Sequence, residues 1–518
     1  MVKLTNLNLK PGDSEERLYA LAAERLGVRA RDIEELVILR RGLDARRRGA
    51  IRWVYSVRVR LRGEAPEPEA GYEIPRLSAS GPRPLVAGFG PAGIFAALVL
   101  ARAGLCPIVL ERGPRMDERQ KAVEAFRSGG PFDPEANVQF GEGGAGAFSD
   151  GKLNTGTRDI RHRWILEQLV ACGAPESILV DAKPHVGTDM LHVTLVNLRR
   201  QLLDLGAQVR FGHRVTGLRV RDGALEGLEV TGPEGPYVLP ARHAVLALGH
   251  SARDTFEMLH AAGVQMEQKP FAVGVRIEHR QSDMDAAQYR RFAGHPCLPA
   301  AGYKLSCHPE NGRSAFSFCV CPGGQVVAAA SEQGRVVTNG MSEYARDREN
   351  INGGLLVNVT PADFGSSHPL AGIAFQRRLE EAAFRLGGGG YAAPCQRVED
   401  FLAGRPSTGP GRVIPSYRPG VRWTDLRQCL PEFVWETLAL ALPMLEGKVR
   451  GYAQGDAVLT AVETRSSSPV RIIRDNSGQC NVRGLYPCGE GAGYAGGILS
   501  AAADGMRCAE KIWEVYGK

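Results

Sequence analysis

The stretch Leu85–Gly93, with the sequence LVAGFGPAG, constrains the fold of this chain more than any other segment. Its first three residues are typical of a short buried strand. The three glycines that follow suit a tight turn, a close approach of the backbone to a pyrophosphate, and packing of the next helix on the strand. Unpaired N–H groups at the start of that helix favour an anion. The segment therefore predicts a nucleotide-binding βαβ unit.

The residues after this turn complete the unit. Ile94, Ala97, Leu98 and Ala101 recur at helical spacing, and a second apolar strand ends at Glu111. A carboxylate at that position accepts hydrogen bonds from ribose hydroxyls and repels a 2′-phosphate. This order of strand, glycines, helix, strand and acid is a more specific indication of a nucleotide-binding unit than the glycines alone. The alternative is a glycine-rich turn in an ordinary α/β unit.

With 518 residues, the chain is long enough for two or three domains. We expect a small α+β module at residues 1–63, a proline-rich linker at 64–83, and a Rossmann-like nucleotide-binding domain at 84–268 and 451–518. The rhythm of alternating strands and helices breaks between the two parts of that domain. Residues 269–450 are therefore expected to form an inserted α+β substrate domain. The predicted fold class is α/β.

The N-terminal module accounts for the whole formal net charge of +7, with 15 Lys and Arg against 8 Asp and Glu in residues 1–63. We expect strands at 4–9, 36–40 and 51–61 and a helix at 14–26. In the last strand apolar and polar residues alternate, so Arg52, Ser56, Arg58 and Arg60 share one face. This face and the run Arg46–Arg48 suggest contact with RNA or an acidic partner. The alternative is a solvated surface.

Two further patterns are antiparallel in character. Short apolar segments at 209–211, 215–220, 225–230 and 237–239 predict a meander of strands that leads into a buried strand at 243–248. Within the inserted domain, the segment Phe316–Val327 predicts a hairpin that turns at Pro322-Gly-Gly.

Three later glycine-rich segments distinguish FAD from a nicotinamide nucleotide. They are Gly141–Lys152, Gly249–Ser251 and Leu485–Gly505. In the third, an apolar strand ends near Glu490, and a helix begins after Gly496 and Gly497. Such an acid can hold a ribityl hydroxyl, and the helix N-terminus stabilises an anionic reduced flavin. A single nucleotide unit would not need these three additional segments.

The chain resembles the FAD-dependent dehydrogenase family of bacteria and plastids, whose members share the glutathione-reductase-like FAD fold. The resemblance spans nearly the whole chain and implies bound FAD and redox activity, but no substrate. The wider FAD group usually has Asp at the position of Glu490. The residues that carry the resemblance are Gly88–Gly93, Asn137–Gly146, Phe148–Leu153, Lys183–Asp189, Ala247–Asp254, Phe318–Gly324, Glu463–Pro469 and Cys488–Gly493.

The segments and the resemblance together predict a set of FAD contacts. The predicted contacts are Gly88, Gly90, Pro91, Ala92, Gly93, Glu111, Arg112, Gly143, Gly144, Ser149, Gly151, Lys152, Val215, Gly249, His250, Ser251, Gly489, Glu490, Gly496, Gly497 and Ile498.

Candidate catalytic residues are fewer. His250 is suited to proton transfer, and Lys152 and Arg465 could stabilise reduced flavin or an anionic substrate. A structural role is the alternative for each. Cys319 and Cys321 are expected on one face of a strand as two buried thiols, because a disulfide between residues i and i+2 is strained and the spacing to Cys307-His308 matches no strong zinc site. No metal site is predicted.

These patterns predict an FAD-dependent oxidoreductase, whether dehydrogenase, reductase or oxidase, that acts on a small organic substrate by hydride transfer at flavin N5. No second nucleotide unit is visible, so NAD(P)H would bind only transiently. The alternatives are a flavoprotein tethered to RNA or a partner through its basic module, and a flavin-binding sensor. The N-terminus lacks an apolar signal segment and the odd number of cysteines, 11, argues against disulfides, so we expect a cytoplasmic protein with no membrane span.

Overall fold

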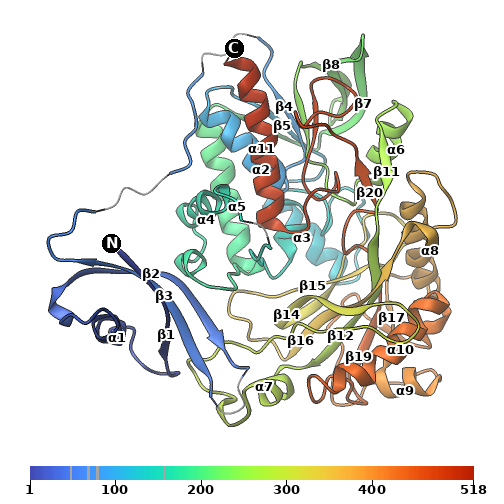
Figure 1. The fold of residues 1–518 in the computed structure, drawn as a ribbon. Coiled ribbons are helices and arrows are strands. Elements are labelled where there is room, and N and C mark those ends of the chain that lie inside the picture. The colour runs from blue at the N-terminus through green and yellow to red at the C-terminus, as the bar shows by residue number, and fades with distance from the viewer. Residues whose placement is uncertain (47–49, 67–70, 78–80, 157, 518) are drawn as a thin grey trace.

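A computed structural model describes residues 1–46, 50–66, 71–77, 81–156 and 158–517. The chain is built around a five-stranded parallel sheet and a larger, mainly antiparallel sheet, with the N-terminal module at one side (Figure 1). The predicted α/β class is confirmed. Arg47 and Arg48 of the basic run lie outside the described residues.

The parallel sheet has the strand order β21-β10-β4-β5-β6. Its strands are β4 (Leu85–Ala87), β5 (Ile108–Glu111), β6 (Gln208–Phe211), β10 (Ala244–Leu246) and β21 (Leu485–Pro487). All except the edge strand β6 are fully buried, as expected for parallel strands covered on both faces. The prediction that residues 209–211 belong to the antiparallel meander is wrong. The preceding helix returns the chain to the sheet, and β6 pairs in parallel with β5.

Helices cover one face of this sheet. They are α2 (Pro91–Arg102), α4 (Arg161–Ala171), α5 (Thr188–Asp204) and α11 (Ile498–Tyr516), while α3 (Met116–Arg127) follows β5. Helices α2 and α11 touch so closely that a Cβ atom on Gly505 would lie 2.0 Å from the carbonyl oxygen of Ala92. The other face packs against α6 (Arg253–Ala261) and an antiparallel layer of β7 (Arg214–Arg221), β8 (Ala224–Gly232) and β9 (Gly235–Pro240). The sheet is therefore the middle of three layers.

The large sheet has the order β13-β14-β16-β12-β19-β17-β18, and β15 pairs with β14. Its strands are β12 (Phe271–Arg280), β13 (Ser306–Cys307), β14 (Ala315–Ala328), β15 (Thr338–Met341), β16 (Asn350–Val359), β17 (Ala393–Arg397), β18 (Val421–Trp423) and β19 (Val458–Glu463). The helices of this region are α7 (Gln281–Tyr289), α8 (Ala371–Leu386), α9 (Val398–Ala403) and α10 (Glu432–Glu446). A short pair, β11 (Met266–Gln268) and β20 (Val470–Ile472), lies between the two main sheets along the chain.

Two details differ from the sequence-based expectations. Segment 316–327 is not a hairpin, because β14 continues through Pro322 as one strand that pairs first with β16 and then with β15. Irregularities in its register absorb the Pro-Gly-Gly residues. Strand β19 pairs with β12 and β17 inside the large sheet, whereas the expected boundary at residue 450 assigns it to the nucleotide-binding part.

The N-terminal module is an antiparallel sheet of order β1-β3-β2 with one helix. Its elements are β1 (Val2–Leu9), α1 (Arg17–Leu26), β2 (Ile33–Asp44) and β3 (Arg52–Leu61). The helix covers the face that carries Tyr55, Val57 and Val59, which are buried. Among the described residues, no helix covers the opposite face. Among the helices of the described residues, none is both long and apolar enough to cross a membrane.

Candidate cofactor and substrate cavity

A cavity of about 1800 Å³ lies at the carboxyl ends of the parallel strands. Strands β4, β10 and β21 lead into it through Gly88, Gly249 and Gly489. The remaining walls come from the large sheet and from the N-terminal module. Ligand cavities in proteins commonly measure about 300 to 1,000 Å³, so this one has room for more than one drug-sized molecule.

The turn between β4 and α2 has the backbone that the sequence predicts. Gly88 has φ +103°, and a Cβ atom there would lie 2.2 Å from the carbonyl oxygen of Ala247. Gly93 does not line the cavity. A Cβ atom at Gly93 would lie 1.9 Å from the carbonyl oxygen of Gly88, so its role is close packing of the helix on the turn. Pro91 and Ala92 begin α2 at the cavity wall, where the helix N-terminus can receive an anion.

Glu111 is more constrained than the sequence indicates. Its side chain accepts hydrogen bonds from the backbone N–H groups of Phe89 (2.8 Å), Gly113 (2.9 Å) and Gly141 (2.9 Å). The carboxylate thus joins three loops, and it is only 5% exposed. Carboxylate oxygens can accept more than one hydrogen bond each, so a ribose contact stays a prediction. Next to it, Arg112 forms ion pairs with Glu135 (2.7 Å) and Asp254 (2.8 Å), and burial opposed by these carboxylates leaves its pKa above the ordinary value.

The glycine segment Gly141–Lys152 approaches the turn that contains Gly88 and Gly90. A Cβ atom on Gly144 would lie 3.0 Å from the Cα atom of Gly90, so both positions need small residues for the loops to touch. Gly143 faces Leu195 instead, and it does not line the cavity. Lys152 points toward Asp150, 2.7 Å away, and also donates to the carbonyl oxygen of Val320.

Asp150, which lines the cavity, forms ion pairs with two cations. Besides Lys152, the guanidinium of Arg346 lies 2.5 Å from its carboxylate. Burial opposes ionisation of Asp150, but the two cations outweigh it and hold its pKa below the ordinary value. The predicted catalytic cation Lys152 is therefore a member of an ion-pair cluster.

The segments Gly249–Ser251 and Leu485–Gly505 meet at His250. Its Nδ1 lies 3.5 Å from Oε1 of Glu490, and its Nε2 is buried without a hydrogen-bond partner among the described residues. Glu490 thus faces an imidazole. The acid that holds the backbone of this loop is Asp504, which accepts from the N–H of Gly489 at 2.8 Å.

The start of α11 is open toward the cavity. Positions where Cβ atoms would stand on Gly249, Gly496 and Gly497 have no protein atom within 4 Å, and all three residues line the cavity. Together with the unpartnered Nε2 of His250, this open space fits a bound FAD at the predicted segments. Side chains at these glycines would occupy the space that the cofactor needs.

Arg465 is held by protein groups. It is buried and donates to Glu380, to Ser251 (2.9 Å) and to Ser331 (2.6 Å). Burial lowers its pKa, and Glu380 opposes that effect. Its side chain still borders the cavity, so a contact with a ligand would add to an existing network.

Most of the predicted site residues lie around this one cavity. Gly93 and Gly143 are the exceptions. The predicted residues that line it are Gly88, Gly90, Pro91, Ala92, Glu111, Arg112, Gly144, Ser149, Gly151, Lys152, Val215, Gly249, His250, Ser251, Arg465, Gly489, Glu490, Gly496, Gly497 and Ile498.

Comparison with known proteins identifies the family. Residues 270–466 match the family model of the FAD-dependent protein, C-terminal domain-like group, and residues 1–60 match a domain of unknown function. Over 531 residues the chain is 46% identical to an uncharacterized protein of Clostridium beijerinckii, with 99% of each chain covered. The chain belongs to one family with this clostridial protein, and the match over residues 270–466 supports an FAD-dependent family.

More distant similarities involve parts of the chain or the fold. An anhydrotetracycline monooxygenase of Streptomyces rimosus is 31% identical over 171 residues, which is 31% of this chain and 29% of that protein. A flavin-dependent brominase, the Bmp2 triple mutant, aligns with a TM-score of 0.39 and 12% identity over 84% of this chain and 80% of its own. A 3-ketosteroid dehydrogenase from Rhodococcus jostii has a TM-score of 0.35 and 13% identity over 86% of this chain and 100% of its own.

In this member of the family, one of the two thiols of β14 differs from the expectation. Cys321 is buried, but Cys319 is exposed toward the cavity with φ +38°. A register irregularity between Phe318 and Cys321 interrupts the alternation of side chains that placed both thiols on one face. Although Cys319 opens to the cavity, the protein atoms packed around both sulfurs displace water and raise the pKa of both thiols, so neither is activated as a thiolate.

Sequence reasoning missed Glu463 as a site residue. It ends β19, borders the cavity, and is 3% exposed. Its carboxylate pairs with Arg276, which donates from Nη2 at 3.0 Å. Burial raises the pKa of Glu463 to about 7 despite this cation. The sequence signal that could have identified Glu463 is an acid at the end of an apolar strand. Its pairing with Arg276 could not be predicted, because it depends on how the strands are arranged in the large sheet.

Proposed function

We propose that this protein is an FAD-dependent oxidoreductase that acts on a small organic substrate by hydride transfer at flavin N5. The observation that carries the proposal is the convergence of four separate glycine segments on one cavity that is larger than a single cofactor site commonly requires. Bound FAD supplies the isoalloxazine ring that accepts or donates the hydride. The walls from the large sheet and the module leave space for the substrate.

The side chains of this protein have positioning roles in this proposal. The helix N-termini of α2 and α11 attract anionic groups, and Glu111 fixes the loops around the nucleotide end. His250 presents an unpaired Nε2, and Lys152 presents a cation held by Asp150. NAD(P)H is proposed only as a transient reductant, because the chain has one nucleotide-binding unit.

The first expected result concerns the cofactor. Purified protein should show flavin absorbance at about 450 nm, or gain it on titration with FAD, and reduction of the bound flavin should bleach this absorbance. Stopped-flow mixing with NADH and with NADPH decides whether either one reduces the protein. Protein that neither contains nor binds FAD would overturn the proposed function.

We also propose Glu463 as the group that gives or takes a proton beside the cavity. The sign of its pH dependence is fixed by its raised pKa. Between its ordinary pKa of 4.5 and about 7, the folded state binds more protons than the unfolded state, so its contribution to stability falls as pH rises. This contribution spans about 3 kcal/mol, because one pKa unit is worth about 1.4 kcal/mol.

Glu463→Gln carries a neutral side chain at every pH. As the pH rises from about 4 to about 8, the unfolding free energy of wild type should therefore fall by about 3 kcal/mol relative to that of this variant. Urea unfolding at several pH values measures it. A difference that does not change with pH would show that Glu463 does not hold a proton near neutrality.

A further inference from the structure

The helix-free face of the N-terminal module is turned toward the cavity. In β3, Tyr55, Val57 and Val59 point to α1, so Arg52, Val54 and Ser56 point the other way. Cross-strand pairing places Ser56 opposite Arg40 of β2 and Val54 opposite Asn8 of β1. All of the residues on this second face that are named here border the cavity. The part of the polar face that these residues form is therefore a wall of the cavity.

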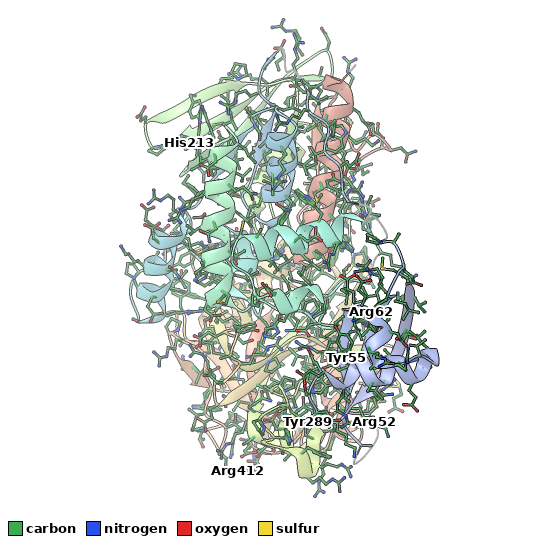
Figure 2. All side chains as sticks on the ribbon, turned by 90° about the vertical axis from the view of Figure 1, so that its left-hand side faces the viewer. Arg52, Tyr55, Arg62, His213, Tyr289 and Arg412 are labelled. Carbon is green, nitrogen blue, oxygen red and sulfur yellow. The ribbon has the colours of Figure 1, made fainter. Side chains whose placement is uncertain are left out.

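Two contacts hold the module in this place. The backbone of Arg41 exchanges hydrogen bonds with Val180 and Ala182, each 2.7 Å long, and its guanidinium pairs with Asp181 at 2.9 Å. At the end of the β2–β3 hairpin, Ile51 is 5% exposed and packs against residues of the inserted region that include Tyr289. Figure 1 shows the hairpin reaching α7, and Figure 2 shows Arg52 and Tyr289 in the same region of the molecule. The module thus contacts both halves of the enzyme.

This part of the cavity has an excess of unpaired positive charge. Arg40 and Arg52 of the module, Lys183 beside it and Lys304 of the inserted region all border the cavity. None of the four has a carboxylate of the described residues within ion-pair distance. By contrast, the nearby Arg41 and Arg46 have Asp181 and Asp44 as partners, and Lys152 has Asp150. Cations that face a concave surface without counter-charges attract an anion strongly.

We propose that the N-terminal module is the substrate-selecting wall of the cavity, and that the substrate is an organic anion whose carboxylate or phosphate groups contact Arg40, Arg52, Lys183 and Lys304. This inference rests on the proposed function. Arginine recognises both oxyanions with paired N–H donors, and the asparagine and serine side chains of the same face add further hydrogen bonds. The charge excess of residues 1–63 then serves the active cavity.

The test compares two oxidants of the same reduced protein. FAD-loaded full-length protein is photoreduced and mixed with ferricyanide, a trianion, or with neutral 1,4-benzoquinone. The variant Arg40→Glu/Arg52→Glu reverses two charges on the cavity face. The matched control is Arg31→Glu/Arg62→Glu, which also reverses two charges, both on exposed arginines of the same module that do not line the cavity; Figure 2 places Arg62 away from Arg52.

The Arg40→Glu/Arg52→Glu variant should react with ferricyanide at least about tenfold more slowly than the control at low ionic strength, because electrostatic attraction raises association rates by about 10 to 1,000-fold. The two proteins should react with benzoquinone at rates within about twofold of each other. Roughly 0.5 M salt should remove most of the ferricyanide difference by screening.

Three other outcomes overturn the inference. Equal ferricyanide rates in the two proteins would show that the face does not set the potential of the cavity. An equal slowing with both oxidants would show a displaced module and no charge selection. Protein that binds no FAD would overturn the proposed function itself, and absorbance of the purified wild type distinguishes that failure before any oxidant is added.

Discussion

A Gly88→Ala variant is expected to lose about 3 kcal/mol or more of folding stability, and with it the ability to retain FAD. Two causes act together. The backbone of Gly88 has φ +103°, which alanine rarely adopts, and the new Cβ atom would lie 2.2 Å from the carbonyl oxygen of Ala247. The atoms that this Cβ would meet belong to the backbone of Ala247 and Leu248, so no flexible side chain can move away.

Gly497→Ala is the matched control, because it makes the same chemical change at another predicted FAD contact. The backbone of Gly497 is extended, which any residue adopts, and no atom lies within 4 Å of the new Cβ. Its stability should stay within about 0.5 kcal/mol of wild type. Its affinity for FAD should fall about tenfold, since the methyl group enters the space expected for the cofactor.

Urea unfolding and FAD titration separate these two effects. The glycine assignment would be contradicted if Gly88→Ala were as stable as wild type. If Gly497→Ala bound FAD with unchanged affinity, the cofactor would not approach the start of α11. Equal destabilisation by both substitutions would mean that the open space at Gly497 is filled in solution.

The site segments could be predicted because each has a local sequence pattern. Strand, glycine turn and helix follow one another within a few residues at Gly88, Gly249 and Gly489. Their convergence also follows from a general rule, since carboxyl ends of neighbouring parallel strands meet at the same edge of a sheet. The convergence of these three turns on one cavity could thus be predicted from the sequence.

Features that depend on distant parts of the chain could not be predicted. Period-2 alternation placed Cys319 and Cys321 together, but the irregular pairing of β14 with β16 turns Cys319 to the cavity. The alternation in β3 identified a polar face correctly. It could not show that this face borders a cavity, because the position of the module depends on contacts such as that of Ile51 with Tyr289.

The other large effect is expected at Glu380 of α8, which joins the region of the parallel sheet to the region of the large sheet. The side chain is fully buried and accepts from two arginines, at 2.7 Å from Arg253 and 3.1 Å from Arg465. Arg253 belongs to α6 beside the parallel sheet, and Arg465 borders the cavity. Glu380→Gln removes the charge that both guanidinium groups share. We expect a loss of about 3 to 5 kcal/mol, because it leaves buried cations with too little counter-charge.

The pH dependence of this effect has a definite sign. Burial opposes ionisation of Glu380, but Arg253 and Arg465 outweigh it and lower its pKa below the ordinary 4.5. The unfolded state therefore binds the proton more tightly, and the ion pair stabilises the fold fully only above the unfolded pKa. The stability gap between wild type and Glu380→Gln should be widest above pH about 5 and should narrow as the pH falls further.

Glu381→Gln provides the control on the same helix. Its carboxylate pairs with Arg335 at 2.7 Å but is 41% exposed, and an exposed ion pair contributes only about 0 to 1 kcal/mol. Urea unfolding of the three proteins at neutral and acid pH measures both differences. A loss below about 1 kcal/mol for Glu380→Gln would mean that water solvates Arg465 or that an anionic ligand neutralises it. In that case Arg465 would be a cation available to the substrate, as the sequence first suggested.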